Sequence, residues 1–348
     1  MKAGRDKCRA EDPNNCRIHH TGRYANGKGE IPPPFDAKRA QSLLKYAFAK
    51  PMELVQYAPP ELSDIELKED ARKLPVEKAV AAVLPYADAF GKRLGEVDAS
   101  LAVAKRQIAA RKAEIRKEIS RISAMKADAS EEKVPLMDSH IDKRSRMLMS
   151  MNASSRDLVA KTYAQSFSDG ELSQTPIGEV GEGVDAISVD TLRFSASRMF
   201  SSRIVPKSKV NIVSTNGGRS RTGKSGIELS AYEDAETLVH EYAHFIENNN
   251  PHVLERCSEF LEHRCKGEES KPLSEMGDLG TFGEDEQGRK DKFFHAYCGK
   301  DYFDENGRRC STEVFSMGVE MMLTHPKAFY DSDREYFAFV VGLMKGII

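Results

Sequence analysis

The chain has 348 residues, of which 40% are hydrophobic and 30% are charged, and its formal net charge at pH 7 is −2. This length predicts two domains, and the near-neutral charge gives no reason to expect nucleic acid or an anionic membrane as a partner. No apolar run is long enough to span a membrane, and residues 1–8 lack the apolar core of a secretion signal. We therefore expect a protein that stays in a cytoplasm or is packaged from one, with cysteines that are thiols or metal ligands rather than disulfides.

Residues 1–35 are predicted to form a separate, disordered tail. Glycine, proline, asparagine and charged residues dominate this stretch, so it can bury little apolar surface. Two cysteines and two histidines of the tail could bind a second, structural zinc ion: Cys8, Cys16, His19 and His20. Their spacing matches no zinc motif with a physical basis, so we favour a disordered peptide with free thiols.

Residues 36–168 are predicted to form a helical domain with coiled-coil-like packing. Apolar residues recur at seven-residue intervals in its centre: Leu94, Leu101, Ile108, Ile115 and Ile122. Such a repeat predicts a narrow apolar stripe that pairs with another helix, and we expect an antiparallel partner within residues 140–167. Basic residues flank the stripe, but acids are interspersed and aromatic residues do not interleave, so we expect a solvated helix face rather than a nucleic-acid site.

Residues 169–348 are predicted to form the second domain. Glycines and a proline mark turns in residues 169–208, where the polar–apolar alternation of residues 186–190 predicts a strand. Residues 209–229 are interpreted as two strands joined by a mobile, basic loop. The strand at residues 227–229 could offer a free edge to an extended peptide, or it could be an interior strand that supports the next helix.

A literal phosphate-loop match lies within this region, at residues 218–225. A phosphate loop must lead into a helix, because the N-terminal amides of that helix hold the phosphates. Residues 226–230 instead alternate polar and apolar side chains, which predicts a strand. We therefore do not expect a nucleotide site.

The pattern His-Glu-x-x-His at residues 240–244 predicts a metal site. His240 and His244 lie four residues apart, so on a helix they project from one face and can bind one zinc ion together. Glu241 lies close enough to accept a proton from a zinc-activated water without being a ligand. The neighbours of these residues are uncharged, as a buried metal-binding helix requires. The alternative is a buried helix whose histidines only form core hydrogen bonds.

The bounds of this helix can also be predicted. Ser230 and Glu233 have the spacing of a capping box, with Ser230 as the N-cap. Residues 248–251, which end in a proline, indicate the C-terminus. The motif therefore lies within a helix of ordinary length.

Two histidines and a water leave one zinc position for a carboxylate from a second helix. Glu313 is the best candidate, because it lies in a largely apolar helix over residues 310–323, where a buried acid needs a partner. Its alternative role is that of an acid in the capping turn of the helix. Glu320 is the other possible ligand, although we expect it instead to act as a hydrogen-bond acceptor that holds a histidine ring in place.

With these residues the chain resembles the zincin metallopeptidases of the gluzincin type. The resemblance implies that His240, His244 and Glu313 bind zinc and that Glu241 is the general base. Together with a second resemblance, to domains of phage and mobile-element proteins, it covers about the last third of the chain. Many gluzincins place a further acid shortly after the ligand, whereas Val-Phe-Ser-Met follows Glu313 here.

A second resemblance connects residues 297–302 and 313–318 with the metallopeptidase-like domains of phage head-morphogenesis and mobile-element proteins. It implies a phage or prophage setting, with a protein substrate in virion assembly or in the host. Tyr302 and Tyr297 are candidate donors to the oxyanion, and His295 is a third.

Together these observations predict an α+β protein with a helical N-terminal domain. A zincin-like domain with a small mixed or antiparallel sheet and an active-site helix follows it. The expected function is that of a zinc metalloendopeptidase with one catalytic zinc ion. The alternative is a catalytically silent zincin-fold protein that serves as a structural or interaction component of a phage particle.

Overall fold

The computed structural model describes residues 70–168, 172–215, 218–230, 233–276, 282–283 and 285–348. The predicted tail, with its four candidate zinc ligands, lies outside the described residues. The described chain combines many helices with small sheets, so the predicted α+β class is confirmed. Among the described residues, no helix has both the length and the apolarity needed to cross a membrane.

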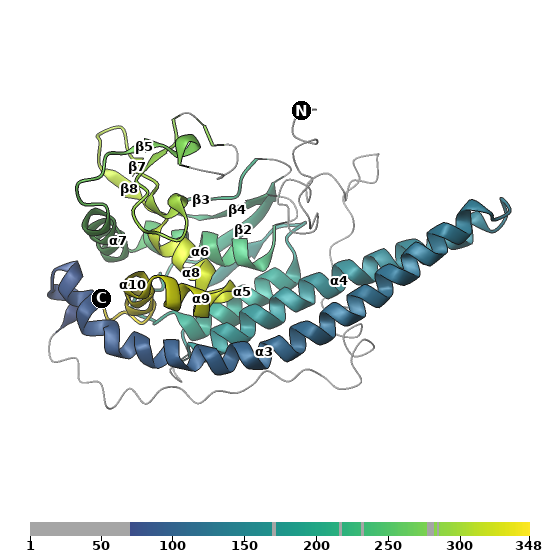
Figure 1. Cartoon of the computed structure of the whole chain (residues 1–348). Helices are drawn as coiled ribbons and strands as arrows, with labels where there is room; N and C mark the ends of the chain where they lie inside the picture. Colours follow the sequence, from purple (N-terminus) through teal and green to yellow (C-terminus); the bar gives the residue numbers. More distant parts are fainter. Residues whose placement is uncertain (1–69, 169–171, 216–217, 231–232, 277–281, 284) are drawn as a thin grey trace.

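A long helical hairpin opens the described chain. After a short 3-10 turn, η2 (Ala71–Lys73), it consists of α3 (Val76–Ala127) and α4 (Val134–Ser166). The two helices run side by side in opposite directions, and their connected ends project well beyond the rest of the molecule (Figure 1). The predicted antiparallel partner of the heptad stripe is therefore confirmed.

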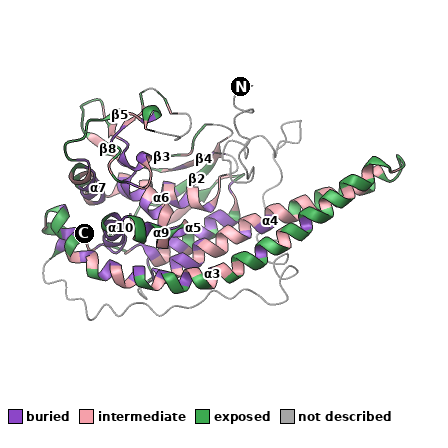
Figure 2. Cartoon of the chain, viewed as in Figure 1, coloured by how far each residue is buried: buried purple, intermediate pink, exposed green. Residues whose placement is uncertain are grey.

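Burial in this hairpin decreases from its base to its tip, as Figure 2 shows. Leu94, Leu101, Ile108 and Ile115 are all buried, whereas Ile122 is only partly buried. From residue 116 to residue 149 no residue is buried, because the two helices have only each other to pack against.

The base of the hairpin packs against the C-terminal helices. The first half of α3 contacts α10 (Arg334–Met344), α9 (Pro326–Ser332) and α7 (Pro251–Arg264). One continuous hydrophobic core includes residues of α3, the helix of the His-Glu-x-x-His motif and α10. The predicted boundary between residues 168 and 169 therefore separates two segments that share this core.

The larger sheet is mixed, as predicted. Its strands are β1 (Ile177–Val180), β2 (Val210–Thr215), β3 (Arg221–Thr222) and β4 (Gly226–Ser230), in the spatial order β1-β2-β4-β3. The pairs β1–β2 and β2–β4 are parallel, and only β3 runs antiparallel to β4.

This topology corrects the interpretation of residues 209–229 as two strands joined by one loop. The strands β2 and β4 are parallel neighbours, and the tight hairpin joins β3 to β4 instead. Residues 227–229 are not a free edge, because β2 pairs with β4 along one side and β3 covers Ile227 and Glu228 on the other. The edge strand on this side of the sheet is β3, and β1 is the edge strand on the other side. Residues 218–225 lead into β4 and not into a helix, which agrees with the rejection of a phosphate loop.

The predicted strand at residues 186–190 is wrong, since these residues begin the helix α5 (Ala186–Met199). Asp185 caps this helix by accepting a hydrogen bond from the backbone N–H of Ser188 at 3.0 Å. The apolar side chains Ile187, Val189 and Leu192 are all buried, on a broad side of the helix that also includes Ser188 and Ser195. Over five residues this periodicity cannot be distinguished from the alternation of a strand.

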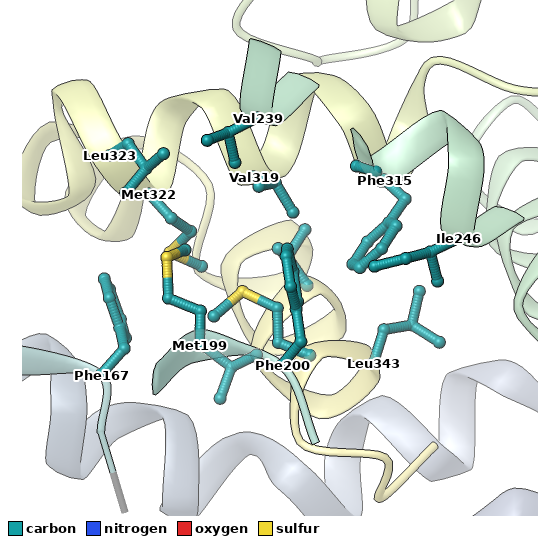
Figure 3. Close-up of a cluster of buried hydrophobic side chains, with 14 of the residues drawn as sticks. Phe167, Met199, Phe200, Val239, Ile246, Phe315, Val319, Met322, Leu323 and Leu343 are labelled. Carbon is teal, nitrogen blue, oxygen red and sulfur yellow. The ribbon is translucent and has the colours of Figure 1, made fainter. Parts of the chain in front are cut away.

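The main core lies between the motif helix α6 (Ala235–Asn249), α8 (Val314–Thr324) and the end of α5. Figure 3 shows side chains from these elements turned toward one another, including Phe200, Phe315 and Ile246. The rings of Phe200 and Phe315 lie 5.9 Å apart between centroids. The α6 helix also contacts β3 and β4, so it lies between the sheet and α8.

The segment between α7 and α8 is built from short elements. They are β5 (Lys271–Pro272), η3 (Leu273–Glu275), β6 (Gln287–Gly288), η4 (Ala296–Gly299), β7 (Tyr302–Phe303) and β8 (Arg309–Ser311). The β7–β8 hairpin leads directly into the N-terminus of α8, where Glu313 lies.

Candidate metal centre

The motif helix begins later than predicted. Its N-cap is Asp234, whose side chain accepts a hydrogen bond from the backbone N–H of Thr237 at 3.0 Å. The predicted N-cap, Ser230, is the last residue of β4 and pairs with Thr215 of β2. The capping box is therefore wrong, because the sheet holds Ser230 in an extended conformation and a second acceptable cap follows it. The predicted C-terminus is confirmed, since α6 ends at Asn249.

The two histidines of α6 meet Glu313 at one point. The distance to Glu313 Oε2 is 3.3 Å from His240 Nε2 and 3.1 Å from His244 Nε2. One ligand atom from each of the three residues lies within 4.8 Å of the others, so the group could hold a metal ion. The side chains are 11%, 12% and 2% exposed, respectively.

Glu313 is the N-cap residue of α8 rather than a residue inside a longer helix. Its carboxylate accepts hydrogen bonds from the Tyr302 hydroxyl to Oε1 at 2.6 Å and from the Ser316 hydroxyl to Oε2 at 2.9 Å. These donors fix a buried carboxylate and direct one of its oxygens at the two histidines.

The second acid predicted in this helix, Glu320, lies behind His240. Its Oε2 is 3.1 Å from His240 Nδ1, the ring nitrogen that faces away from Glu313. The contact has the distance of an ion pair, although the ring N–H does not point along it as in an aligned hydrogen bond. Glu320 therefore lies where an acceptor that orients the ring is expected, and Glu313 occupies the ligand position.

Glu247, on α6 one turn after His244, is a further buried acid that was not singled out in the sequence. Its Oε2 is 3.6 Å from His244 Nδ1, and the side chain is 1% exposed. Each histidine thus turns Nε2 toward Glu313 and Nδ1 toward a further carboxylate, an arrangement typical of metal-binding histidines. The signal was an acid three residues after His244, on the same helix face and directly after the apolar residues Phe245 and Ile246.

Glu241, the predicted base, is 6% exposed and contacts the edge strand β3. The hydroxyl of Thr222 lies 2.6 Å from Glu241 Oε2 and 2.9 Å from its backbone oxygen, so it donates to one or both of them. This contact holds the Glu241 side chain against the sheet. Thr222 was not singled out in the sequence, because its role depends on a strand that pairs beside α6.

The three candidate oxyanion donors lie in the segment that precedes α8, and Tyr302 and Tyr297 connect to the centre through Glu313. The Tyr302 hydroxyl donates to Glu313, and the Tyr297 hydroxyl lies 3.4 Å from that of Tyr302. Burial and the charge of Glu313 raise the pKa of both phenols, which keeps them protonated as donors. His295 accepts from the backbone N–H of Tyr297. A role at the oxyanion stays a prediction for all three.

The charges of the metal-free group depend on one another. Burial alone would lower the pKa of His240, but the carboxylates of Glu313 and Glu320 outweigh burial and raise it to about 9. The pKa of His244 is raised in the same way by Glu313 and Glu247. Burial opposes the charge on Glu313, but the two histidines hold the pKa of Glu313 well below its usual range.

Metal binding by this group is expected to strengthen as pH rises. The neutral imidazole is the ligand, so protons compete with the metal at every pH below the raised pKa, which for His240 is about 9. The apparent affinity should rise by about tenfold per pH unit for each histidine proton released, and should level off above that pKa. Competition titrations with a chromophoric chelator from about pH 6 to pH 9 measure this slope. A flat profile would contradict the ligand assignment.

No protein-family model, curated protein or solved structure matches this chain. The resemblance to zincin metallopeptidases therefore stays a prediction from the motif. The case for a function depends on the geometry of His240, His244, Glu313 and the acids around them.

Proposed function

We propose that the protein is a zinc-dependent peptidase with its active site at the N-terminus of α8. The observation that carries this proposal is the approach of His240 Nε2 and His244 Nε2 to one oxygen of the buried Glu313 carboxylate. Two imidazoles and one carboxylate are the protein ligands of a hydrolytic zinc site, in which a fourth position is left for water or substrate.

Zinc suits this donor set better than other common metals. Magnesium and calcium prefer oxygen ligands only, whereas two imidazole nitrogens favour a transition metal. A zinc ion held here would act as a Lewis acid and would lower the pKa of a bound water toward about 7. The backing carboxylates Glu320 and Glu247 would keep each ring in the tautomer that presents Nε2.

Glu241 is the proposed proton carrier of the reaction. It follows His240 directly in α6, and its carboxylate is buried and held by Thr222. As general base it would take a proton from the attacking water, and as general acid it would deliver that proton to the leaving amine. The Tyr302 hydroxyl orients Glu313 throughout by donating to Oε1.

An extended peptide is the proposed substrate. The edge strand β3 is two residues long and pairs on one side with β4, and its Thr222 side chain reaches the catalytic Glu241. A substrate strand added beside β3 would therefore run close to the metal centre, with backbone hydrogen bonds as the source of affinity. The sequence resemblance suggests a phage or prophage protein that acts on a partner during assembly or in the host.

Cleavage of peptides by the zinc-loaded protein tests the proposal. The protein is incubated with denatured protein substrates and with candidate assembly partners, and new termini are identified by mass spectrometry. We expect cleavage that stops after treatment with a chelator and returns when zinc is added. Metal-bound protein that produces no new termini from any substrate would favour the catalytically silent alternative.

A further inference from the structure

Glu247 connects the two chain segments that carry the metal ligands. It lies on α6, and its carboxylate accepts hydrogen bonds from Thr312 N at 3.1 Å, from Thr312 Oγ1 at 2.6 Å and from Ser311 Oγ at 2.9 Å. Its Oε2, which accepts from Ser311 Oγ and Thr312 N, also faces His244 Nδ1 at 3.6 Å. A single carboxylate thus contacts one ligand histidine and the two residues immediately before Glu313.

We infer that Glu247 is a positioning residue, which fixes the histidines of α6 relative to Glu313 before a metal ion binds. The inference rests on the proposed metal site, because it describes how that site is held together. If it is correct, replacing Glu247 weakens metal binding more than it destabilises the folded protein.

The segment before α8 depends on this carboxylate for its polar contacts. Thr312 is fully buried, so its backbone N–H would lack a partner if Glu247 were removed. The Thr312 hydroxyl donates to Glu247 Oε1 and can accept the backbone N–H of Val314 at 3.3 Å, which ties the first turn of α8 to α6. Glu313, between these two residues, has no side-chain cap bond of its own. Glu247 therefore holds the backbone on either side of Glu313 against α6, while the Tyr302 and Ser316 hydroxyls orient the Glu313 carboxylate.

The surroundings of Glu247 indicate a role at the metal centre rather than an ordinary ion pair. Glu247 is buried, and a buried carboxylate requires hydrogen bonds or a compensating positive charge. In the described part of the chain, no lysine or arginine lies within ion-pair distance of it, and His244 is its one titratable cationic partner. A metal ion bound to Nε2 of His244 would supply positive charge on the side of Glu247 where the His244 ring lies.

The test compares metal binding in Glu247→Gln, Thr312→Val and the double variant, with Glu255→Gln as the matched control. Glu255 is an exposed glutamate on α7, so its change removes one charge without touching the centre. Dissociation constants for Zn²⁺ are measured by competition with a chromophoric chelator. The visible spectrum of the Co²⁺-loaded protein reports the geometry of the ligands, and thermal unfolding of the metal-free proteins reports folding.

We expect Glu247→Gln to weaken Zn²⁺ binding by about 10- to 100-fold and to alter the Co²⁺ spectrum, whereas Glu255→Gln changes neither. Thr312→Val should weaken binding in the same direction, and Thr312→Ser should restore it by returning the hydroxyl. The fold-loss of Zn²⁺ affinity in the double variant should be smaller than the product of the fold-losses in the two single variants, because both changes break the same contact between Thr312 and Glu247.

Wild-type affinity and spectrum in a folded Glu247→Gln protein would overturn the inference, as would wild-type affinity in Thr312→Val. These results are separable from failure of the proposed function. A protein that binds Zn²⁺ through Glu247 but cleaves no peptide contradicts the peptidase and leaves the positioning role intact. If the protein cleaves peptides but its Zn²⁺ affinity does not change when Glu247 is replaced, only the positioning role is contradicted. If the wild-type protein binds no metal, both the positioning role and the peptidase function are contradicted.

Discussion

Replacing Glu241 with glutamine is expected to slow peptide cleavage by about 10²- to 10⁴-fold while the metal stays bound. Glutamine has nearly the size of glutamate, and its carbonyl oxygen can still accept the hydrogen bond from Thr222. It cannot take up a proton at neutral pH, so water would have to be activated without a base. His240, His244 and Glu313 are unchanged in this variant, so metal content should remain at the wild-type level.

The experiment pairs turnover numbers with metal analysis of the same samples. Glu255→Gln is a matched control, because Glu255 is an exposed glutamate on α7 whose replacement removes one charge without touching the centre. That control should cleave at close to the wild-type rate. A Glu241→Gln protein that binds metal and cleaves as fast as wild type would exclude Glu241 as the base.

His240→Ala is expected to remove the metal and, with it, all cleavage activity. The change leaves two of the three ligand residues, and it removes the ring that lies between Glu313 and Glu320. Metal content measured by atomic spectroscopy should fall from about one ion per chain to a small fraction of that value. Thermal unfolding should no longer respond to added zinc, since a ligand stabilises only the protein that binds it.

His263→Ala provides the control for this loss. His263 lies on α7 and pairs with Glu335 at 3.2 Å, in a different part of the molecule. Its replacement should leave metal content unchanged. Stoichiometric zinc in His240→Ala would disprove the assignment of His240 as a ligand and would require another set of donors.

The parts of the site that could be predicted are those that depend on local spacing. The four-residue interval between His240 and His244 determines that both rings share a helix face, whatever surrounds them. Glu313 was found because an acid among apolar residues needs a partner. The helical hairpin followed from a seven-residue repeat, which has a single geometric explanation.

What could not be predicted depends on contacts between distant segments. The parallel pairing of β2 with β4 depends on tertiary contacts. It places Ser230 in the sheet, so that Asp234 and not Ser230 caps the helix. The role of Glu247 required knowledge that Ser311 and Thr312 pack against α6. In α5, a buried helix face and an alternating strand give the same short pattern.

The decrease in burial along the hairpin has a consequence for hydrogen exchange. Amides near residues 79–94 of α3 lie in the main core, so they should exchange only when the whole protein unfolds. Amides of residues 116–127 and 134–149 belong to helix turns with no buried residue, and they should open locally at a much lower free energy. The rate of amide hydrogen exchange, measured by mass spectrometry, is therefore expected to increase along α3, from the residues beside α10 to the tip of the hairpin.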